Sequence, residues 1–296
     1  MKTLIIIDSN ALIHRAFHAL PELTTKKGEK VNAIYGFLLI FFRAARELKP
    51  DCVVATFDRI EPTFRHKRFK DYKAKRKKAP QDLYDQIPKI KNILRALNIP
   101  IFEKAGFEAD DLIGTIAKKA KEQEKDIEIY ILTSDLDVFQ LIDDKTRIYN
   151  LRKGIKDIEI FDEKKVIEKF DFSPKQIIDF KALAGDPSDN LPGAQGIGKE
   201  TTVKLIKEYK TIENLYRVLK KGEAWDLTSK IRENLIKHEK QVLLSYELAK
   251  IDQFVDIDFN LEKSKYISLS ADEKTKQKIK QIFENYNFYT LINKIL

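Results

Sequence analysis

Carboxylates recur in this chain as closely spaced pairs, several of them near the ends of apolar segments. The pairs are Asp110 with Asp111, Asp135 with Asp137, and Asp186 with Asp189. Crowded carboxylates repel one another unless a cation lies between them, and oxygen ligands of this kind suit Mg²⁺. The chain as a whole is basic, with a formal net charge of +9, so these clusters of acids have the opposite sign to the chain as a whole. The pattern predicts a divalent-metal site that hydrolyses phosphodiesters.

The full set of candidate metal ligands could hold two ions about 4 Å apart, one to activate a water and one to stabilise the leaving oxygen. Nine acids make up this set: Asp8, Asp58, Glu108, Asp110, Asp111, Asp135, Asp137, Asp186 and Asp189. Helix capping is the alternative for some of them, because Glu108, Asp110 and Asp111 fall in the first turn of an expected helix. Capping accounts for one or two acids and not for the group.

Residues 59–78 form a strongly basic segment, with ten Lys and Arg against two acids. Phe64, Phe69 and Tyr72 are interleaved with these bases. That mixture of positive charge and aromatic surface suits single-stranded nucleic acid. Because the segment directly follows Asp58, we expect it at the edge of the metal site. A solvated basic loop without a ligand is the alternative.

Residues 193–199 contain the pattern Gly-x4-Gly-Lys of a phosphate-binding Walker loop. Such a loop requires Ser or Thr at the next position and a preceding strand, but Glu200 follows here and Asp189-Asn-Leu-Pro precedes, so ATP binding is not favoured. The Gly-Ile-Gly sequence before an amphipathic segment at 203–209 is more typical of a helix-hairpin-helix. In that motif the glycines let backbone amides approach a DNA phosphate. A plain helix-capping turn is the alternative.

Composition limits the kinds of partner. The 55 Lys and Arg against 46 Asp and Glu give a pI near 9.2, which favours polyanions such as nucleic acid. Apolar segments stop well short of the roughly 20 residues of a membrane span, so we expect no membrane partner and a cytoplasmic location. Cys52 has no partner for a disulfide and is expected to be buried. His14 and His18 are spaced for a shared zinc, but no third ligand accompanies them.

The elements that position these residues follow from the apolar periodicity. We expect strands at 3–8, 52–58, 100–102, 127–132 and 147–150, and helices at 32–48, 82–97 and 108–121. Continuous apolar strands between helices predict an α/β fold with a mostly parallel sheet covered on both faces. Ligands bind beyond the carboxyl ends of such strands, where Asp8, Asp58 and Asp135 fall. From about residue 162 short helices with Gly and Pro punctuation replace this pattern.

Seven motifs occur in order along the chain: Ile-Asp8-Ser-Asn-Ala-Leu-Ile-His-Arg15, Thr-Phe-Asp58, Thr-Phe-Arg65, Asp71-Tyr72-Lys73-Ala-Lys-Arg76, Glu108-Ala-Asp-Asp, Thr-Ser-Asp-Leu-Asp137 and Gly-Asp186-Pro-Ser-Asp-Asn-Leu-Pro-Gly. Their order and spacing, from residue 1 to about 296, resemble the 5′→3′ exonuclease domain of bacterial DNA polymerase I, a member of the flap endonuclease family. The resemblance implies a PIN-like nuclease core at 1–161, including a basic helical arch at about 59–98. It also implies a helical region at 162–296 with a helix-hairpin-helix at about 186–209.

The resemblance also implies roles for single residues. Asp8, Asp58, Glu108 and Asp110 would serve one metal ion and Asp135, Asp137, Asp186 and Asp189 the second, with Asp111 close by. Lys73 and Arg76 would act at the scissile phosphate. The residues expected to bind nucleic acid are Arg15, Arg65, Lys70, Tyr72, Lys75, Gly193, Gly196, Gly198, Lys199 and Thr201. In relatives the hairpin also holds a monovalent cation, for which K⁺ is the candidate.

The implied activity is a structure-selective, Mg²⁺-dependent 5′ nuclease, with Mn²⁺ as a substitute, that removes 5′ flaps and RNA primers in replication and repair. Expected partners are branched or 5′-ended DNA, an RNA primer on DNA, and a DNA polymerase; we expect a monomer at the bacterial nucleoid. A ribonuclease acting mainly on RNA and a non-catalytic DNA-binding scaffold are the rival hypotheses. No polymerase domain follows residue 296, so we expect either an autonomous nuclease or an excised N-terminal domain.

Overall fold

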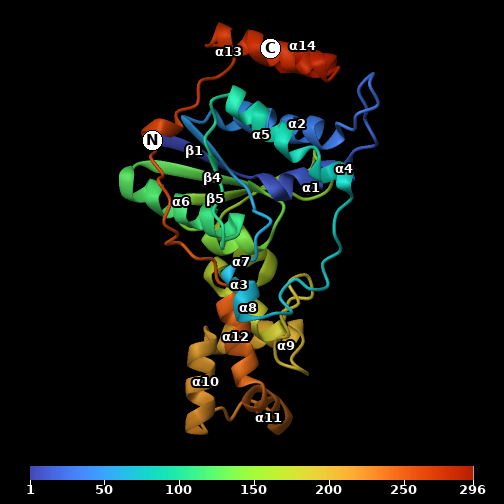
Figure 1. Cartoon of the computed structure of the whole chain (residues 1–296). Coiled ribbons are helices and arrows are strands. Elements are labelled where there is room, and N and C mark those ends of the chain that lie inside the picture. The colour runs from blue at the N-terminus through green and yellow to red at the C-terminus, as the bar shows by residue number, and fades with distance from the viewer. Residues whose placement is uncertain (296) are drawn as a thin grey trace.

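A computed structural model describes residues 1–295, which form a sheet-containing end and a narrower helical arm (Figure 1). The described residues form a six-stranded sheet in the order β3-β2-β1-β4-β5-β6. Its strands are β1 (Lys2–Asp8), β2 (Cys52–Thr56), β3 (Ile101–Phe102), β4 (Ile127–Thr133), β5 (Thr146–Leu151) and β6 (Ile158–Phe161). The pairs from β3 to β5 are parallel, as predicted, whereas β6 pairs antiparallel with β5 and was not expected from the sequence.

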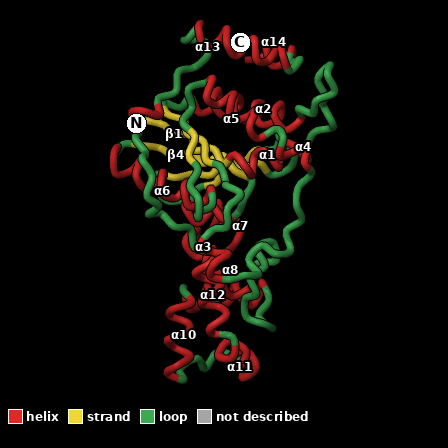
Figure 2. The backbone as a smooth tube through the Cα atoms, viewed as in Figure 1, coloured by secondary structure: helices red, strands yellow, loops and turns green. Residues whose placement is uncertain are grey.

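Both faces of the sheet are covered because both sets of alternating side chains in the central strands are apolar. Leu4 and Ile6 of β1 pack with α6 (Ala109–Gln123), whereas Ile5 and Ile7 pack on the opposite face. The helices of that opposite face are α1 (Ser9–Ala19), α2 (Asn32–Leu48) and α5 (Ile87–Ala96). Figure 2 shows the strands between these two layers of helices.

The expected helix at 82–97 is divided into α4 (Gln81–Tyr84) and α5. Gln86 lies at the break, is fully buried, and accepts hydrogen bonds from the backbone amides of Ala33 and Ile34 at 2.9 and 3.2 Å. The side chain thereby satisfies amides at the start of α2 that have no partner within their own helix. Within the expected arch at about 59–98, the basic segment 59–78 contains one helix among the described residues, α3 (Phe64–Arg68), and α4 and α5 follow it.

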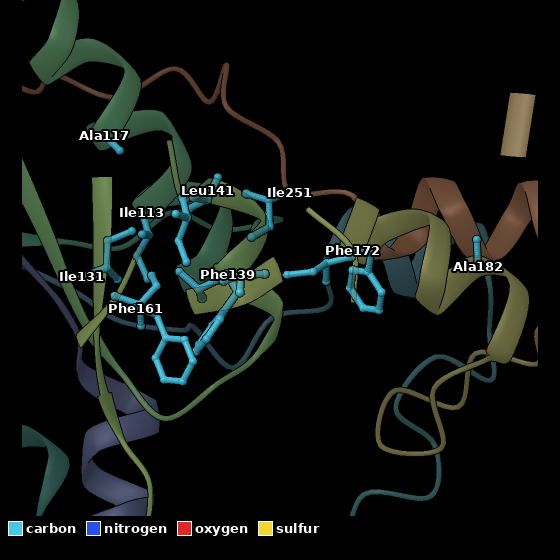
Figure 3. Close-up of a cluster of buried hydrophobic side chains, with 14 of the residues drawn as sticks. Ile113, Ala117, Ile131, Phe139, Leu141, Phe161, Phe172, Ala182 and Ile251 are labelled. Atoms are coloured by element: carbon cyan, nitrogen blue, oxygen red, sulfur yellow. The ribbon is translucent and has the colours of Figure 1, made fainter. Parts of the chain in front are cut away.

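The arm consists of helices that continue the apolar core away from the sheet. They are α7 (Glu163–Phe170), α8 (Ile177–Ala184), α9 (Lys199–Tyr209), α10 (Ile212–Lys221), α11 (Ser229–Lys237) and α12 (Glu239–Ala249). Figure 3 shows the join, where Phe139 and Phe161 at the sheet lie in one buried cluster with Phe172 and Ala182 at the arm. Among the described residues, no helix combines the length and apolar character needed to span a membrane.

After α12 the chain returns to the sheet through residues 251–266, which we call the strap. Successive turns of α6 hold the strap by hydrogen bonds that join Asp111 to Asp252, Thr115 to Val255, Lys119 to Ile257 and Gln123 to Leu261. The last helices, α13 (Glu273–Asn285) and α14 (Tyr289–Ile295), then lie beside α5 and α2 (Figure 1). Residues 251–295, the last part of the expected helical region at 162–296, thus pack on the sheet-containing end.

Candidate metal and nucleic-acid site

Parallel pairing brings three carboxylates to the carboxyl edge of the sheet, and helix α6 adds a fourth. Asp8 is the last residue of β1, Asp58 follows β2 by two residues, and Asp135 follows β4 by two residues. Asp110 lies in the first turn of α6, close enough to the other three for their charges to act on it. We call Asp8, Asp58, Asp110 and Asp135 the first carboxylate group.

Burial and mutual repulsion raise pKa values in the first carboxylate group. Asp8 is 3% exposed; burial, with the charges of Asp135 and Asp58, raises its pKa to about 7, although Thr133 Oγ1 donates to its Oδ2 at 2.6 Å. Burial also raises the pKa of Asp110 well above its ordinary value, with Asp135 and Asp8 contributing. A bound divalent cation would offset both effects, and an all-oxygen donor set fits a hard cation such as Mg²⁺.

Asp137, Asp186 and Asp189 form a second carboxylate group, in which one oxygen of each residue lies within 4.8 Å of the others. Asp137 begins the 3₁₀ helix η1 (Asp137–Leu141), whereas Asp186 and Asp189 lie in the turn after α8. Lys181 of α8 contacts Asp137, and its Nζ lies 2.6 Å from Asp186 Oδ2. Burial raises the pKa of Asp186, but Lys181 outweighs this effect and holds the pKa at about 2.

The basic segment contacts Glu108 and one acid of the second carboxylate group. Tyr72 Oη lies 3.2 Å from Glu108 Oε2 and 3.2 Å from Asp189 Oδ2, so it can donate its one proton to either. Lys73 Nζ donates to Glu108 Oε1 at 2.9 Å, and a guanidinium nitrogen of Arg76 lies 3.7 Å from Asp189 Oδ1. The two cations expected to act at a phosphate therefore lie beside the carboxylates. Tyr72 is 3% exposed, however, which differs from the expectation that it stacks on a base.

Asp111 and Arg65 also differ from their expected roles, because they bind each other. The guanidinium of Arg65 donates to both carboxylate oxygens of Asp111, at 2.7 and 2.8 Å, and the two residues are 2% and 0% exposed. Arg65 further donates to the carbonyls of Leu248 and Lys250, and Asp111 accepts from the amides of Glu108 and Asp252. Their hydrogen-bonding groups are engaged in the fold, so the structure supports neither a metal ligand at Asp111 nor a nucleic-acid contact at Arg65.

The other predicted nucleic-acid residues lie on two surfaces. Lys70 and Lys75 are exposed on the basic segment, and Arg15 is half-buried on α1. Gly196, Gly198 and Lys199 are exposed, and Thr201 half-buried, where the loop after α8 leads into α9. Gly193 instead is buried with φ of 62°, and a Cβ there would lie 2.4 Å from the amide nitrogen of Gly185. Its lack of a side chain thus serves the close packing of the loop on α8.

Sequence reasoning missed three residues that act on the carboxylates. Thr133 donates to Asp8, Asn10 Oδ1 accepts from the amide of Asp58 at 3.1 Å, and Lys181 lies in the second carboxylate group. Asn10 and Thr133 fall inside two of the motifs, so their positions were a signal that could have been used. Lys181 is an ordinary lysine in a helix, and nothing in its local sequence indicates that α8 directs it toward Asp137 and Asp186.

The fold and the site together define a class: an α/β protein with hydrolase-like carboxylate groups at the carboxyl edge of a parallel sheet and a basic segment beside them. Two family models cover the chain, namely "5′-3′ exonuclease, N-terminal resolvase-like domain" at residues 3–171 and "5′-3′ exonuclease, C-terminal SAM fold" at 172–287. The chain belongs to the 5′-3′ exonuclease family. The family and the fold class predicted from the sequence are thus confirmed.

The chain matches a relative that is much longer than itself and one of similar length. It is 38% identical over 295 residues to DNA polymerase I of Bacillus subtilis, covering 99% of this chain and 32% of that protein. It is 38% identical over 282 residues to the 5′-3′ exonuclease of Aquifex aeolicus, covering 95% of this chain and 92% of that one. The chain therefore spans about a third of the length of the polymerase relative and most of the Aquifex protein.

Solved structures share the fold at low sequence identity. The T5 5′-exonuclease with bound zinc is 17% identical with a TM-score of 0.70, and the match covers 96% of this chain and all of that one. The catalytic core of Rad2 in complex with DNA substrate is 15% identical with a TM-score of 0.58, covering 96% and 88%. These likenesses extend the fold assignment to the arm as well as the sheet.

Proposed function

We propose that this protein is a structure-selective 5′ nuclease that hydrolyses DNA phosphodiesters with two divalent ions, Mg²⁺ in the cell and Mn²⁺ as a substitute. The observation that carries the proposal is the gathering of two carboxylate groups beside Lys73 and Arg76. A protein that only bound DNA would gain nothing from gathering acids whose burial, together with mutual repulsion, raises the pKa of Asp8 and Asp110. A cation is the partner that such a site requires.

The grouping of the acids suggests which residues hold which ion. The first carboxylate group would hold one ion and the second carboxylate group the other, so Asp135 moves from its expected place to the first group. Glu108 is engaged by Lys73 and Tyr72, and we assign it to positioning these two side chains. When bound, ions of this kind activate a water and neutralise charge on the phosphate and the leaving oxygen.

The chain's own cations would act on the substrate. Lys73 Nζ, held by Glu108, and Arg76, whose side chain is 55% exposed beside Asp189, lie where they can neutralise charge that develops on the scissile phosphate. Lys70 and Lys75 would bind the backbone of a single strand beyond the site. Gly196, Gly198, Lys199 and Thr201 would hold duplex backbone at the start of α9, with K⁺ as an added ligand.

The biological role follows from the relatives. The similarity to DNA polymerase I supports a role beside a DNA polymerase. We propose that the protein acts there as a monomer in the bacterial cytoplasm and removes 5′ flaps and RNA primers during replication and repair. These assignments rest on similarity, and the activity itself can be tested directly.

The test is cleavage of a 5′-labelled DNA flap in Mg²⁺, beside a chelator control and the Asp110→Asn variant. Metal-dependent incision near the flap junction, lost in both controls, is expected. Tight binding without incision in Mg²⁺ and in Mn²⁺ would overturn the proposal in favour of a DNA-binding scaffold. A length-matched all-RNA substrate that is cleaved faster than the DNA flap would overturn the assignment to DNA in favour of a ribonuclease.

A further inference from the structure

An ammonium group lies inside the second carboxylate group. The side chain of Lys181 is 12% exposed, and its Nζ binds Asp186 Oδ2 at 2.6 Å and also contacts Asp137 Oδ1. The third acid, Asp189, lies within hydrogen-bond distance of Tyr72 and within 3.7 Å of Arg76. Every acid of this group therefore already has a cation beside it before any metal ion binds.

The first carboxylate group differs in this respect. Within the described residues, the ion pairs of Lys and Arg shorter than 4 Å include Glu108, Asp137, Asp186 and Asp189 but none of Asp8, Asp58, Asp110 and Asp135. Instead, those four acids lie together at the carboxyl edge of the sheet. The second carboxylate group is therefore in direct contact with the protein's own cations, whereas the first carboxylate group is not.

The position of Lys181 Nζ sets it in competition with a metal ion. A divalent ion bound by Asp137 and Asp186 would use the same oxygens that the ammonium now contacts. Its metal–oxygen distances would be about 2.0–2.6 Å. The two cations would then lie a few ångströms apart in a largely buried place, where like charges repel more strongly than in water. Binding of the ion at the second group therefore requires the flexible lysine side chain to move away.

We propose that Lys181 is an internal counter-cation that weakens binding of a divalent ion at the second carboxylate group, so that the first group fills at lower metal concentration than the second. This inference rests on the proposed function, because it presumes that both groups bind metal. It makes Lys181 a positioning residue that sets the order of metal loading. It also gives Asp137 and Asp186 a partner in the metal-free protein.

The test is a Mn²⁺ titration of the full chain without DNA, read by calorimetry and by the electron paramagnetic resonance signal of free Mn²⁺. We expect wild type to show one tight and one weak site. Lys181→Met and Lys181→Gln should tighten the weak site at least tenfold and leave the tight site unchanged, whereas Lys181→Arg should behave as wild type. Lys175→Met, which removes an exposed charge in the 3₁₀ turn just before α8, is the matched control.

A second readout does not depend on binding constants. Without metal, Lys181→Met leaves Asp137 and Asp186 unneutralised, so its melting temperature should fall and its stabilisation by Mn²⁺ should exceed that of wild type. Equal weak-site affinities in wild type, Lys181→Met and Lys181→Gln would overturn the inference. A wild-type protein that binds no Mn²⁺, or binds it equally after Asp110→Asn and Asp186→Asn, would overturn the proposed function instead.

Discussion

Asp110 and Asp111 are adjacent in the chain yet have opposite environments. Asp110 faces the other acids of the first carboxylate group, whereas Asp111 is fully buried against Arg65. Successive residues on a helix point about 100° apart, so one residue of the pair can reach the sheet edge while its neighbour faces the strap. The two side chains therefore contribute to different properties of the protein.

Replacing Asp110 by Asn should remove activity and leave the fold intact. We expect cleavage of a DNA flap to fall at least about 100-fold, because even second-shell changes at metal sites cost 10–100-fold. The folded protein raises the pKa of Asp110, so the ionised carboxylate destabilises the metal-free fold at neutral pH. The urea midpoint in a chelating buffer should therefore stay the same or rise. A lower midpoint would contradict the placement of Asp110 among repelling acids.

Replacing Asp111 by Asn should lower stability. The change leaves Arg65 buried without its counter-charge, and breaking a buried pair in this way costs about 3–5 kcal/mol. The measurement is the free energy of unfolding by urea. Glu61→Gln, which breaks the exposed pair between Arg59 and Glu61, is the control and should have little measurable effect. Similar small effects in both variants would show that the Arg65–Asp111 pair does not hold the fold together.

At the scale of elements, the junction of α8 and α10 contains a buried acid, Asp179, that forms no ion pair with any residue the structure describes. Asp179 is 3% exposed, and its Oδ1 accepts from the amide of Ile212, the first residue of α10, at 2.8 Å. Burial raises the pKa of Asp179 from 3.8 to about 6. The folded protein thus binds this proton more tightly than the unfolded chain, and its stability falls as pH rises from about 4 to about 6.

Asp179→Asn should stabilise the arm at pH 8, because the amide oxygen still accepts from Ile212 and no charge is buried. A pKa shift of about two units corresponds to about 3 kcal/mol, and we expect 1–3 kcal/mol of it to appear in the free energy of unfolding. The advantage should largely vanish near pH 4, where the wild-type carboxyl is protonated in the folded state and no charge is buried. An advantage that is equal at pH 4 and pH 8 would rule out ionisation as its cause.

Most elements of the fold could be predicted from the sequence because they are marked by local apolar patterns. The strands at Lys2–Asp8 and Ile127–Thr133 and the helix at Asn32–Leu48 agree closely with expectation. Other features depend on distant residues. The helix breaks at Gln86, where the side chain binds backbone amides of α2. The strap is held by polar side chains of α6, and in the sequence these look like any solvated helix face.

In the candidate site, too, the features set by local sequence pattern could be predicted, whereas those set by distant residues could not. Parallel strands carry their following residues to one edge, so the convergence of Asp8, Asp58 and Asp135 followed from strand prediction alone. The partner of each acid could not be predicted in this way, because Arg65, Tyr72 and Lys181 could each face solvent, substrate or a carboxylate. Only the packing of α3 against the end of α12, and of α8 against η1, decides among these.

At the scale of the whole molecule, the last helices add to the core of the sheet-containing end. Phe283 of α13 is fully buried and lies with its ring centroid 6.3 Å from that of Phe42 on α2 and 6.2 Å from that of Phe288. These contacts cover a face of α2 that is rich in aromatic side chains. The terminal segment therefore stabilises the layer that supports β1 and, through it, Asp8.

Phe283→Ala should lower the free energy of unfolding by about 3–5 kcal/mol, because it leaves a cavity in a packed aromatic cluster. Tyr289→Ala on α14 is the control, since its side chain is 54% exposed. Urea denaturation followed by circular dichroism gives both values. Comparable losses in the two variants would mean that α13 contributes no more to the core than an exposed surface residue.

The strap makes the arm an insertion that is attached to the sheet-containing end at two points. The chain enters the arm after β6 and leaves it after α12, where Arg65 and α6 fasten the return segment. A unit on one tether can rotate about that tether, but a unit on two cannot twist without breaking one of them. The turn that bears Asp186 and Asp189 is therefore held in fixed register with Asp8 and Asp110, and the loop that leads into α9 follows this turn directly. If a duplex binds at that loop, as proposed, the covalent path of the chain sets its distance from the carboxylates.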